Sequence, residues 1–385
     1  MNRRDFLKSG LLTMAGLNAL DIRAAGVRSP HWGRTLLLVE LNGGNDGLNT
    51  VIPYSDPLYQ ELRPKIAIKR DQVLQLSGQL GLHPAMDALM SHWEKSELAV
   101  VNGVGYPDPN RSHFRSIDIW DTASGSEEVL QAGWVARAFA ANNPPASLTA
   151  DSIVIGRNSA PVSGAGIRNI SMRSARNFVR EARKLSAINQ QATNAALSHL
   201  LAVQGDIRRA ATDLEQRLEQ AGEFTVAFPK NRFGRDLETA ARLLASGVRV
   251  PVIKVALGSF DTHANQAGTH RRLLTELSTG LSAFQEAMQA GGLWDQLLVM
   301  TYSEFGRRAA ENGSRGTDHG TAAPHLLMGG RVNGGFYGKQ PALYDLENKD
   351  LKYSTDYREL YSSVLHDWWG ISELPGYTPL RGLIA

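Results

Sequence analysis

The stretch Thr35-Leu-Leu-Leu-Val-Glu-Leu41 is a nearly continuous apolar run that ends at Asn42-Gly43-Gly44-Asn45-Asp46-Gly47. A run that is apolar at successive positions suits a strand that is buried on both faces, as in the centre of a parallel sheet. The glycine-rich segment predicts a turn directly after that strand. We therefore predict a central strand over 35–41, with Asn45 and Asp46 at one edge of the sheet.

The rest of the chain alternates strand and helix signals. We predict strands at 98–101, 153–155, 252–257, 297–301 and 325–328, and helices at 84–95, 112–123, 265–290 and 356–369. This alternation predicts an α/β fold with a doubly wound, mostly parallel central sheet flanked by helices. Residues 173–222 hold no strand candidate and predict a helical insertion. We expect these helices to pack on the core, and a cap over the site is the alternative.

Composition limits the chemistry of the chain. The 385 residues are 42% hydrophobic and 21% charged, which is typical of a globular protein, and we expect one α/β domain over 26–385. The chain has 0 Cys, which excludes disulfides, thiolate metal sites and cysteine nucleophiles. The formal net charge of +3 is too small to predict a nucleic-acid partner.

Residues 1–25 predict an export signal. The basic start Arg3-Arg4-Asp5-Phe6-Leu7-Lys8 precedes a weakly apolar run over 9–20 and the small residues Ala24 and Ala25. This order is typical of a signal peptide, and the paired arginines resemble the twin-arginine signal. The predicted partner is the twin-arginine translocation machinery, and the expected location is periplasmic or secreted, without a stable membrane anchor. A surface amphipathic helix is the alternative interpretation of this segment.

Polar residues gather where the predicted strands end, which is where ligands bind in α/β sheets. They belong to five loops: Asn45 and Asp46; Arg111, Ser112 and His113; Asp261 and His263; Glu304 and Arg307; and Asp318 and His319. Carboxylates combined with imidazoles suit zinc, manganese or iron. We predict one or two divalent metal ions, most favourably zinc or manganese, with ligands drawn from Asp46, Asp261, His263, Glu304, Asp318 and His319. Second-line candidates are Asn45, His113 and His325, and each Asp-His pair taken alone is more often a hydrogen-bonded turn than a ligand set.

Ser112 stands where the helix 112–123 is predicted to begin. Backbone N–H groups and the helix dipole stabilise anions at such a position, and a hydroxyl beside a metal is activated as a nucleophile. An ordinary N-cap is the alternative role. Arg111 and Arg307 are candidates for binding the oxygens of a phosphate or sulfate.

Four segments resemble the motifs of the domain-of-unknown-function 1501 family. They are Gly43-Gly44-Asn45-Asp46-Gly47-Leu48-Asn49-Thr50, Arg111-Ser112-His113-Phe114, Ser303-Glu304-Phe305-Gly306-Arg307 and Asp318-His319-Gly320, and the resemblance runs from about Thr35 to Trp369. Members of this family are similar to the alkaline phosphatase and sulfatase superfamily.

That resemblance implies an alkaline-phosphatase-like α/β core, two divalent metals and a nucleophile at a helix N-terminus. It implies Asp46 as the first-strand metal ligand, Ser112 as the nucleophile, and Asp261 and His263 as ligands of the other metal. Ser303-Glu304 stands in place of the superfamily's Asp-His pair. Either His319 is then the final ligand, or Asp318-His319 is that pair and His325 is the last ligand.

These observations predict an exported, metal-dependent hydrolase or transferase that acts on an anionic phosphate or sulfate ester. One alternative is a non-catalytic secreted binding protein that retains the hydrolase fold. Another is a metal-dependent enzyme that hydrolyses an ester on cell-surface polysaccharide.

Overall fold

A computed structural model describes residues 30–185, 194–220 and 224–385. Residues 31–385 form one compact unit. The predicted signal peptide, 1–25, lies outside the described residues, so export remains a prediction.

The core of this unit is a mixed, largely parallel sheet in the order β11-β5-β10-β9-β1-β8-β6-β7, with β14 also paired to β5. Its strands are β1 (Thr35–Leu41), β5 (Leu98–Gly105), β6 (Ser152–Ile155), β7 (Asn169–Met172), β8 (Val252–Leu257), β9 (Leu297–Tyr302), β10 (Ala323–Met328), β11 (Gly335–Tyr337) and β14 (Thr355–Asp356). The predicted strand 35–41 is β1, which lies centrally and runs parallel to both β8 and β9. The predicted fold class is confirmed.

Strand β10 runs antiparallel to both of its neighbours, β5 and β9. Its beginning therefore lies at the edge where the parallel strands β1, β8 and β9 end. Residues that precede β10 consequently reach the same edge as residues that follow the parallel strands, and this places Asp318 and His319 beside the loops after β8 and β9.

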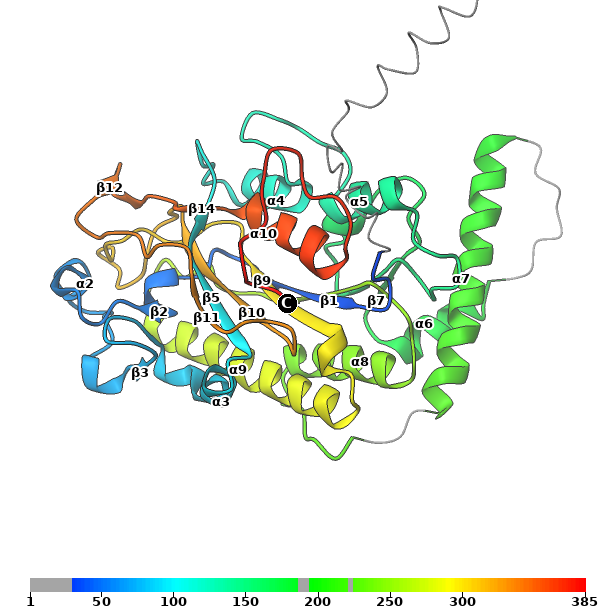
Figure 1. The fold of residues 1–385 in the computed structure, drawn as a ribbon, viewed down its shortest axis with the longest axis horizontal. Helices are drawn as coiled ribbons and strands as arrows, with labels where there is room; N and C mark the ends of the chain where they lie inside the picture. Colours follow the sequence, from blue (N-terminus) through cyan, green and yellow to red (C-terminus); the bar gives the residue numbers. More distant parts are fainter. Residues whose placement is uncertain (1–29, 186–193, 221–223) are drawn as a thin grey trace, which may run out of the picture. The chain divides into compact units, whose positions relative to one another are not determined.

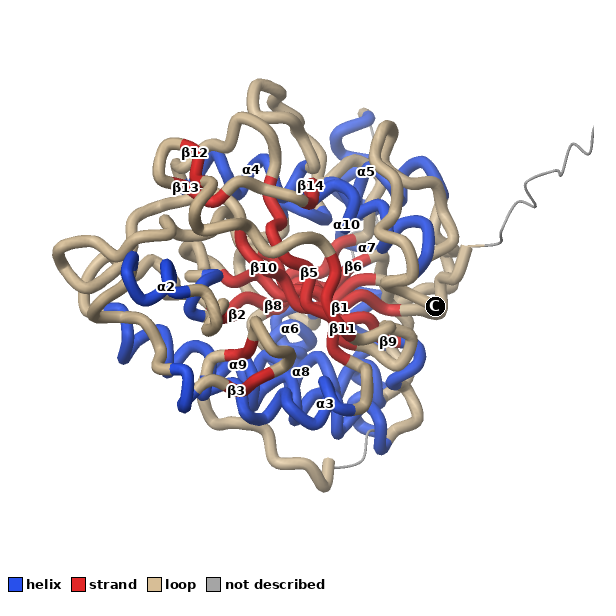
Figure 2. Tube along the Cα trace, turned by 60° about the vertical axis from the view of Figure 1, so that its left-hand side comes forward, coloured by secondary structure: helices blue, strands red, loops and turns tan. Residues whose placement is uncertain are grey.

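Helices cover both faces of the sheet, as Figures 1 and 2 show. One face carries η3 (Pro84–Leu89), α3 (Met90–Glu94), α8 (Arg232–Ala245) and α9 (Gln266–Ala290), and the other carries α4 (His113–Thr122), α5 (Trp134–Asn142), α10 (Tyr357–Ser363) and the π-helical turn η6 (Val364–Trp368). Strand β1 serves both layers, because Leu37 and Val39 pack into the first and Leu36 and Leu38 into the second. Alternate side chains of a strand point to opposite faces, which explains its continuous apolar sequence.

The segment predicted as a helical insertion forms α6 (Ala175–Ala182) and α7 (Ala195–Gln220), with residues 186–193 and 221–223 outside the described part. α6 contacts the edge strand β7 and α7, and α7 contacts α8. These helices therefore pack at the β7 end of the sheet (Figure 1).

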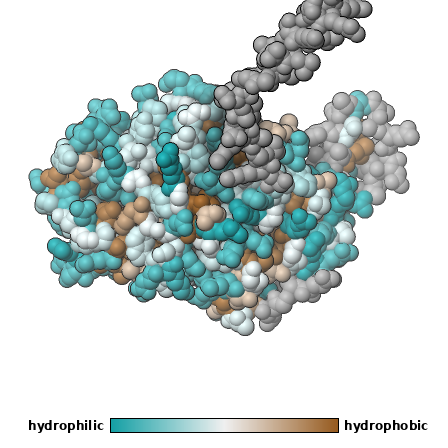
Figure 3. Space-filling model, in the orientation of Figure 1, coloured by the Kyte–Doolittle hydropathy of each residue, from teal (hydrophilic) through white to brown (hydrophobic). Residues whose placement is uncertain are grey.

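Small elements complete the chain: η1 (Gly47–Asn49), β2 (Val51–Ile52), α2 (Pro57–Leu62), η2 (Arg70–Gln72), β3 (Leu74–Gln75), β4 (Gly81–Leu82), η4 (Ala160–Val162), η5 (Trp294–Gln296), β12 (Leu346–Glu347) and β13 (Asp350–Leu351). Across the face drawn in Figure 3, hydrophobic residues lie scattered among hydrophilic ones. Within the described ranges, no helix has the length and apolar character needed to cross a membrane.

Candidate metal centre

Three connections bring imidazole and carboxylate groups together at the carboxyl edge of the sheet. The loop after β8 carries Asp261 and His263, the loop that leads into β10 carries Asp318 and His319, and α4 begins at His113. A backbone β-bridge between Arg307 and His319 ties the segment after β9 to the loop before β10. Side chains far apart in sequence thus meet because their strands are neighbours in the sheet.

Asp261, His263 and His319 form a close triangle of potential ligand atoms. Asp261 Oδ1 lies 3.0 Å from His263 Nε2 and 3.3 Å from His319 Nε2, and the two Nε2 atoms are 2.9 Å apart. Ligands at zinc distances of about 2.0–2.1 Å in a tetrahedron are separated by about 3.3 Å. The triangle therefore has nearly the dimensions of one face of a zinc site.

His113 approaches the same carboxylate from the other side. Its Nε2 lies 3.4 Å from Asp261 Oδ2, and this nitrogen is buried without a hydrogen-bond partner in the described structure. His113, Asp261 and His319 together offer three ligand atoms that lie within 4.8 Å of one another and could hold a metal ion. A second-line candidate of the sequence thus belongs to the centre of the cluster.

The other ring nitrogen of each histidine faces an oxygen. His113 Nδ1 lies 2.8 Å from Glu304 Oε1, His319 Nδ1 lies 2.9 Å from the carbonyl oxygen of Arg111, and His263 Nδ1 lies 3.4 Å from Asp318 Oδ1. Carbonyl and carboxylate oxygens only accept hydrogen bonds, so they favour a proton on Nδ1 and a lone pair on Nε2. Oxygen groups behind histidine ligands orient the rings in this way in metal sites.

The donor atoms of this cluster therefore fit a divalent cation. Three Nε2 atoms converge on the Asp261 carboxylate, and with these nitrogens unprotonated the set of donors suits a divalent cation. Burial lowers the pKa of His319, although its bonds to Arg111 and Asp261 oppose the shift, so the neutral form that can bind metal is favoured.

Glu304 supports the cluster from behind rather than facing Asp261. Its buried carboxylate accepts the N–H of Gly43 at 2.9 Å and 3.1 Å, in addition to contacting His113. This arrangement connects the turn after β1 to the first residue of α4. The sequence marked Glu304 as a possible ligand, and the structure places it as the hydrogen-bond partner of His113.

Arg307 connects the loops of the site through hydrogen bonds. Its fully buried side chain donates to Asp261 Oδ1 at 2.7 Å, to the carbonyl of Gly44 at 2.7 Å and to that of Thr317 at 2.9 Å. Partial burial opposes ionisation of Asp261, but the hydrogen bond and charge of Arg307 lower the pKa of that carboxyl to about 2. Asp261 is consequently a carboxylate at neutral pH.

Asp46 lies in a separate, buried group. Its Oδ2 accepts from Arg63 Nη1 at 2.7 Å and also from Gln266, while Oδ1 is buried without a partner in the described structure. Burial opposes ionisation of Asp46, yet the charge and hydrogen bond of Arg63 bring its pKa below the usual value. A guanidinium thus balances the carboxylate that the family resemblance implies as a metal ligand.

Arg63 and Gln266 were not predicted from the sequence. Arg63 follows α2 and Gln266 is the first residue of α9, so neither stands directly after a strand. Arg63 also donates to Asn49 Oδ1 and to the carbonyl of Ala309. Asn45, another second-line candidate, contacts Thr50 and His270.

Ser112 occupies the N-cap position of α4, which is the alternative role for this residue, and it is exposed with no side-chain capping bond. Both of its neighbours are tied into the cluster, because the Arg111 carbonyl contacts His319 and the His113 ring contacts Glu304. The first bond of the helix runs from the Ser116 amide to the Ser112 carbonyl. The amides of residues 113–115 precede that bond, so they are available to an anion.

Arg111 and His325 occupy different surroundings. The Arg111 side chain is 41% exposed and donates to Asp350 Oδ2 at 2.8 Å. His325 is buried within β10, with its ring centroid 5.2 Å from that of Trp120, and burial lowers its pKa to about 3. Neither nitrogen of His325 has a partner within the described residues. The structure therefore groups Arg111 with the site loops and His325 with the core.

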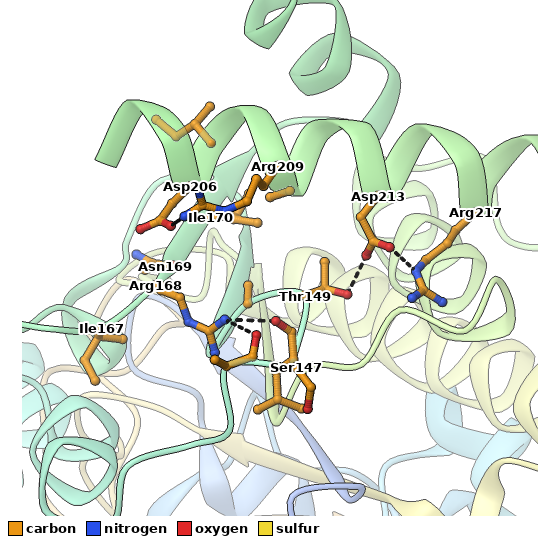
Figure 4. A pocket seen from close by; sticks show the side chains of 15 residues that line it. Ser147, Thr149, Ile167, Arg168, Asn169, Ile170, Asp206, Arg209, Asp213 and Arg217 are labelled. Carbon is orange, nitrogen blue, oxygen red and sulfur yellow. Dashed lines mark hydrogen bonds and ion pairs between the residues drawn. The ribbon is translucent and has the colours of Figure 1, made fainter. Parts of the chain in front are cut away.

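A separate cavity of about 280 Å³ lies between α7 and the segments 146–150 and 167–170 (Figure 4). The charged side chains that α7 contributes are paired, Arg209 with Asp206 and Arg217 with Asp213. None of the residues that line this cavity belongs to the metal cluster.

Several solved structures resemble this chain at low sequence identity. The lipoteichoic acid synthase LtaP from Listeria monocytogenes is 10% identical with a TM-score of 0.37, and the match covers 91% of this chain and 74% of that one. The zinc complex of the C-terminal periplasmic domain of EcEptC from Escherichia coli is 13% identical with a TM-score of 0.43, covering 92% and 88%. The PsFucS1 sulfatase from Pseudoalteromonas sp. is 10% identical with a TM-score of 0.35, covering 87% and 67%.

These TM-scores are all below 0.5, so the roles of individual residues rest on the geometry of this chain alone. No curated protein matches the sequence. A family model, described as protein of unknown function (DUF1501), matches residues 34–372. Because the match spans nearly all of the described unit and includes the four motifs at the sheet edge, the chain belongs to the DUF1501 family.

Proposed function

We propose that this protein is a metal-dependent hydrolase or transferase that acts on a phosphate or sulfate ester. The observation that carries the proposal is the convergence of His113, His263 and His319 on Asp261, directly beside the N-terminus of α4. A cation site next to free helix amides suits a substrate that carries a compact negative charge.

The proposed cofactor is one zinc ion bound by Asp261, His263 and His319, with His113 as the fourth candidate ligand. Nitrogen and oxygen ligands in a small triangle suit zinc, and the oxygen contacts at each Nδ1 are typical of zinc sites. When bound, such an ion stabilises the negative charge that develops on a transferring phosphoryl or sulfuryl group. One ion is favoured over two because the described residues offer a single group of three possible ligands, His113, Asp261 and His319.

The proposed nucleophile is Ser112. Its Oγ forms a bond to the phosphorus or sulfur atom while the bond to the ester oxygen breaks, and the departing oxygen takes the electron pair and a proton to become an alcohol. Water then cleaves the serine ester, which releases phosphate or sulfate and restores the hydroxyl. In this proposal the amides of residues 113–115, which precede the first hydrogen bond of α4, bind the oxygens of the transferring group. Arg111 is a further candidate for these oxygens, although its side chain also pairs with Asp350.

The test compares Ser112→Ala with His319→Ala, using 4-nitrophenyl phosphate and 4-nitrophenyl sulfate as substrates. We expect Ser112→Ala to keep its zinc and lose turnover by at least about 10³-fold, as expected when the nucleophile of a hydrolase is removed. His319→Ala should lose both zinc and turnover. Ser91→Ala, at an exposed serine of α3, is the control and should match the wild type.

Two results would contradict this proposal. Full turnover by Ser112→Ala would remove the nucleophile assignment. A zinc-loaded wild-type protein that hydrolyses neither ester nor a wider panel of phosphate and sulfate esters would favour the alternative, a secreted binding protein on a hydrolase fold.

We also propose that the protein is exported by the twin-arginine pathway. The support is the Arg3-Arg4 pair, with the weakly apolar run behind it. Replacing both arginines by lysine should leave the precursor in the cytoplasm, as measured by cell fractionation. Unchanged export of that variant would contradict the assignment.

A further inference from the structure

Ser112 is held through its main chain rather than through its hydroxyl. Its amide donates to the side-chain Oδ1 of Asn110 at 2.8 Å, and its carbonyl accepts the Ser116 amide at 2.8 Å. An N-cap serine commonly uses its side-chain oxygen to accept an amide of the first helical turn, and within the described structure Ser112 makes no such bond. The backbone is therefore bound on both sides of a hydroxyl that the helix leaves unused.

Asn110 is held in turn by Tyr106, the residue that directly follows β5. The backbone amide of Asn110 donates to the phenol oxygen of Tyr106 at 3.1 Å, and Tyr106 is only 3% exposed. Pro107 and Pro109 lie between the two residues and restrict the backbone there. The bond thus closes a short, stiff loop that leads from the sheet to Ser112.

The hydrogen bonds continue from Tyr106 to Glu304. The hydroxyl of Ser116 donates to the backbone carbonyl of Glu304 at 2.5 Å, so its single proton is used there. The phenol of Tyr106, 2.9 Å from Ser116 Oγ, must then be the donor of that bond. Each hydroxyl in this chain of bonds donates once and accepts once, and the chain runs from Asn110 to Glu304.

Glu304 also holds the residue that follows Ser112. Its carboxylate lies 2.8 Å from His113 Nδ1, while its backbone carbonyl accepts the last bond of the chain from Asn110. One residue behind the metal cluster is therefore connected to both neighbours of Ser112. This double connection fixes the main chain of Ser112 relative to the histidines.

We propose that Asn110 and Tyr106 are positioning residues for Ser112, which hold its main chain beside the metal cluster and leave its hydroxyl free to attack the ester. The inference rests on the proposed function for the attack, whereas the holding of Ser112 can be measured without turnover. Neither residue binds substrate or metal in this proposal, so their loss should change kcat rather than KM or zinc affinity.

The first arm of the test measures turnover of 4-nitrophenyl phosphate and 4-nitrophenyl sulfate by the zinc-loaded full chain. We expect Asn110→Ala to lower kcat about 10–100-fold, with KM and zinc affinity within about two-fold of the wild type, because a small displacement of a reacting group is costly. Tyr106→Phe, which removes only the hydroxyl, should lower kcat in the same way. Asn110→Asp keeps an acceptor for the Ser112 amide and should recover most of kcat, while its negative charge raises KM.

Two control variants remove the same kinds of bond elsewhere. Asn231→Ala removes a side-chain oxygen that accepts the Gly234 amide at 2.7 Å at the start of α8. Tyr54→Phe removes a buried phenol that donates to the carbonyl of Ser77. Both should lower stability and leave kcat unchanged. Equal losses of kcat in control and site variants, or wild-type kcat in Asn110→Ala, would overturn the proposal.

The second arm follows hydrogen exchange of the Ser112 amide by NMR, in zinc-loaded protein without substrate. This amide should exchange about 10-fold faster in Asn110→Ala, as expected from the loss of one hydrogen bond, and at the wild-type rate in Asn231→Ala. Unchanged exchange in Asn110→Ala would overturn the proposal. If the wild type turns over neither ester but the amide exchanges faster in Asn110→Ala, the proposed function fails while the holding of Ser112 by Asn110 is supported.

Discussion

At the scale of single residues, Glu304 gives the sharpest test of how the histidines are held. Its carboxylate is buried and lies 2.8 Å from His113 Nδ1, whereas Asp318 is 53% exposed and lies 3.4 Å from His263 Nδ1. We expect Glu304→Gln to weaken zinc binding about 10–100-fold, the usual effect of changing a group that orients a ligand. Asp318→Asn should weaken it much less. Competition with a chromogenic chelator measures both, and equal effects would contradict the role given to Glu304.

Arg63 provides a test of the second buried group. Removing it leaves the carboxylate of Asp46 buried without its cation, so we expect Arg63→Met to lower the free energy of unfolding by about 3–5 kcal/mol. The double variant Arg63→Met/Asp46→Asn should recover part of that loss, because the uncompensated charge is gone. Urea denaturation of both variants checks this. If Arg63→Met alone is as stable as the wild type, Arg63 does not balance the charge of Asp46.

The sequence pointed to most residues of the cluster but not to how they are arranged. Asp261, His263 and His319 were identifiable because each stands in a loop at a strand end. His113 ranked low because it follows Ser112 in a helix start, where sequence alone does not show which way a ring points. Arg63 carried no signal at all, since it reaches Asp46 through the tertiary fold from the end of α2.

At the scale of secondary structure, the hydrophobic pattern predicted where strands lie in the sequence, but it did not predict their direction in the sheet. The expected strands 35–41 and 252–257 coincide with β1 and β8, because runs that are buried on both faces are continuous in sequence. The antiparallel direction of β10 was not predictable, since an apolar run carries no information on orientation. Two-residue strands such as β12 and β13 are too short for periodicity to reveal.

The turn after β1 fits closely against the loop that carries Asp261. Gly43 has a φ of +115°, and a Cβ there would lie 2.4 Å from the backbone nitrogen of Asp261. Gly43→Ala should therefore displace the Asp261 loop, reduce zinc affinity and destabilise the fold. Gly268→Ala is the control, because Gly268 lies in α9 with open space around its Cα, and it should stabilise the protein by about 0.5–1 kcal/mol. Zinc titration and thermal unfolding distinguish the two, and intact zinc binding in Gly43→Ala would contradict the close fit.

At the scale of the whole molecule, a buried charge network links the sheet to α4. Asp121 accepts from Tyr302 at 2.9 Å and from Asn158 at 3.0 Å, close to the ion pair of Glu40 and Lys254. Burial raises the pKa of Asp121 to about 7, although the charge of Lys254 opposes the shift. Such a carboxyl binds its proton more tightly in the folded state than in the unfolded chain.

The sign of the resulting pH dependence follows from that difference. Between the unfolded pKa of 3.8 and the folded pKa of about 7, the folded state holds more protons, so the contribution of Asp121 to stability falls as pH rises and is constant above about pH 7. The contribution of Asp121 to the free energy of unfolding can change by at most about 1.4 kcal/mol per pH unit. In urea denaturation between pH 4.5 and 7.5, we expect the free energy of unfolding of Asp121→Asn to decline less with rising pH than that of the wild type. The control is Asp118→Asn, on the exposed side of the same helix, which should decline as the wild type does. A decline of the same size in Asp121→Asn would contradict the assignment.

The central claim is that one edge of the sheet builds a site for a single divalent cation. The most direct measurement is an anomalous difference map, collected at the zinc absorption edge from zinc-saturated crystals of this protein. We predict one peak per chain, within bonding distance of Asp261 Oδ1, His263 Nε2 and His319 Nε2. No peak at these atoms, or a second peak of equal height at Asp46, would contradict the account.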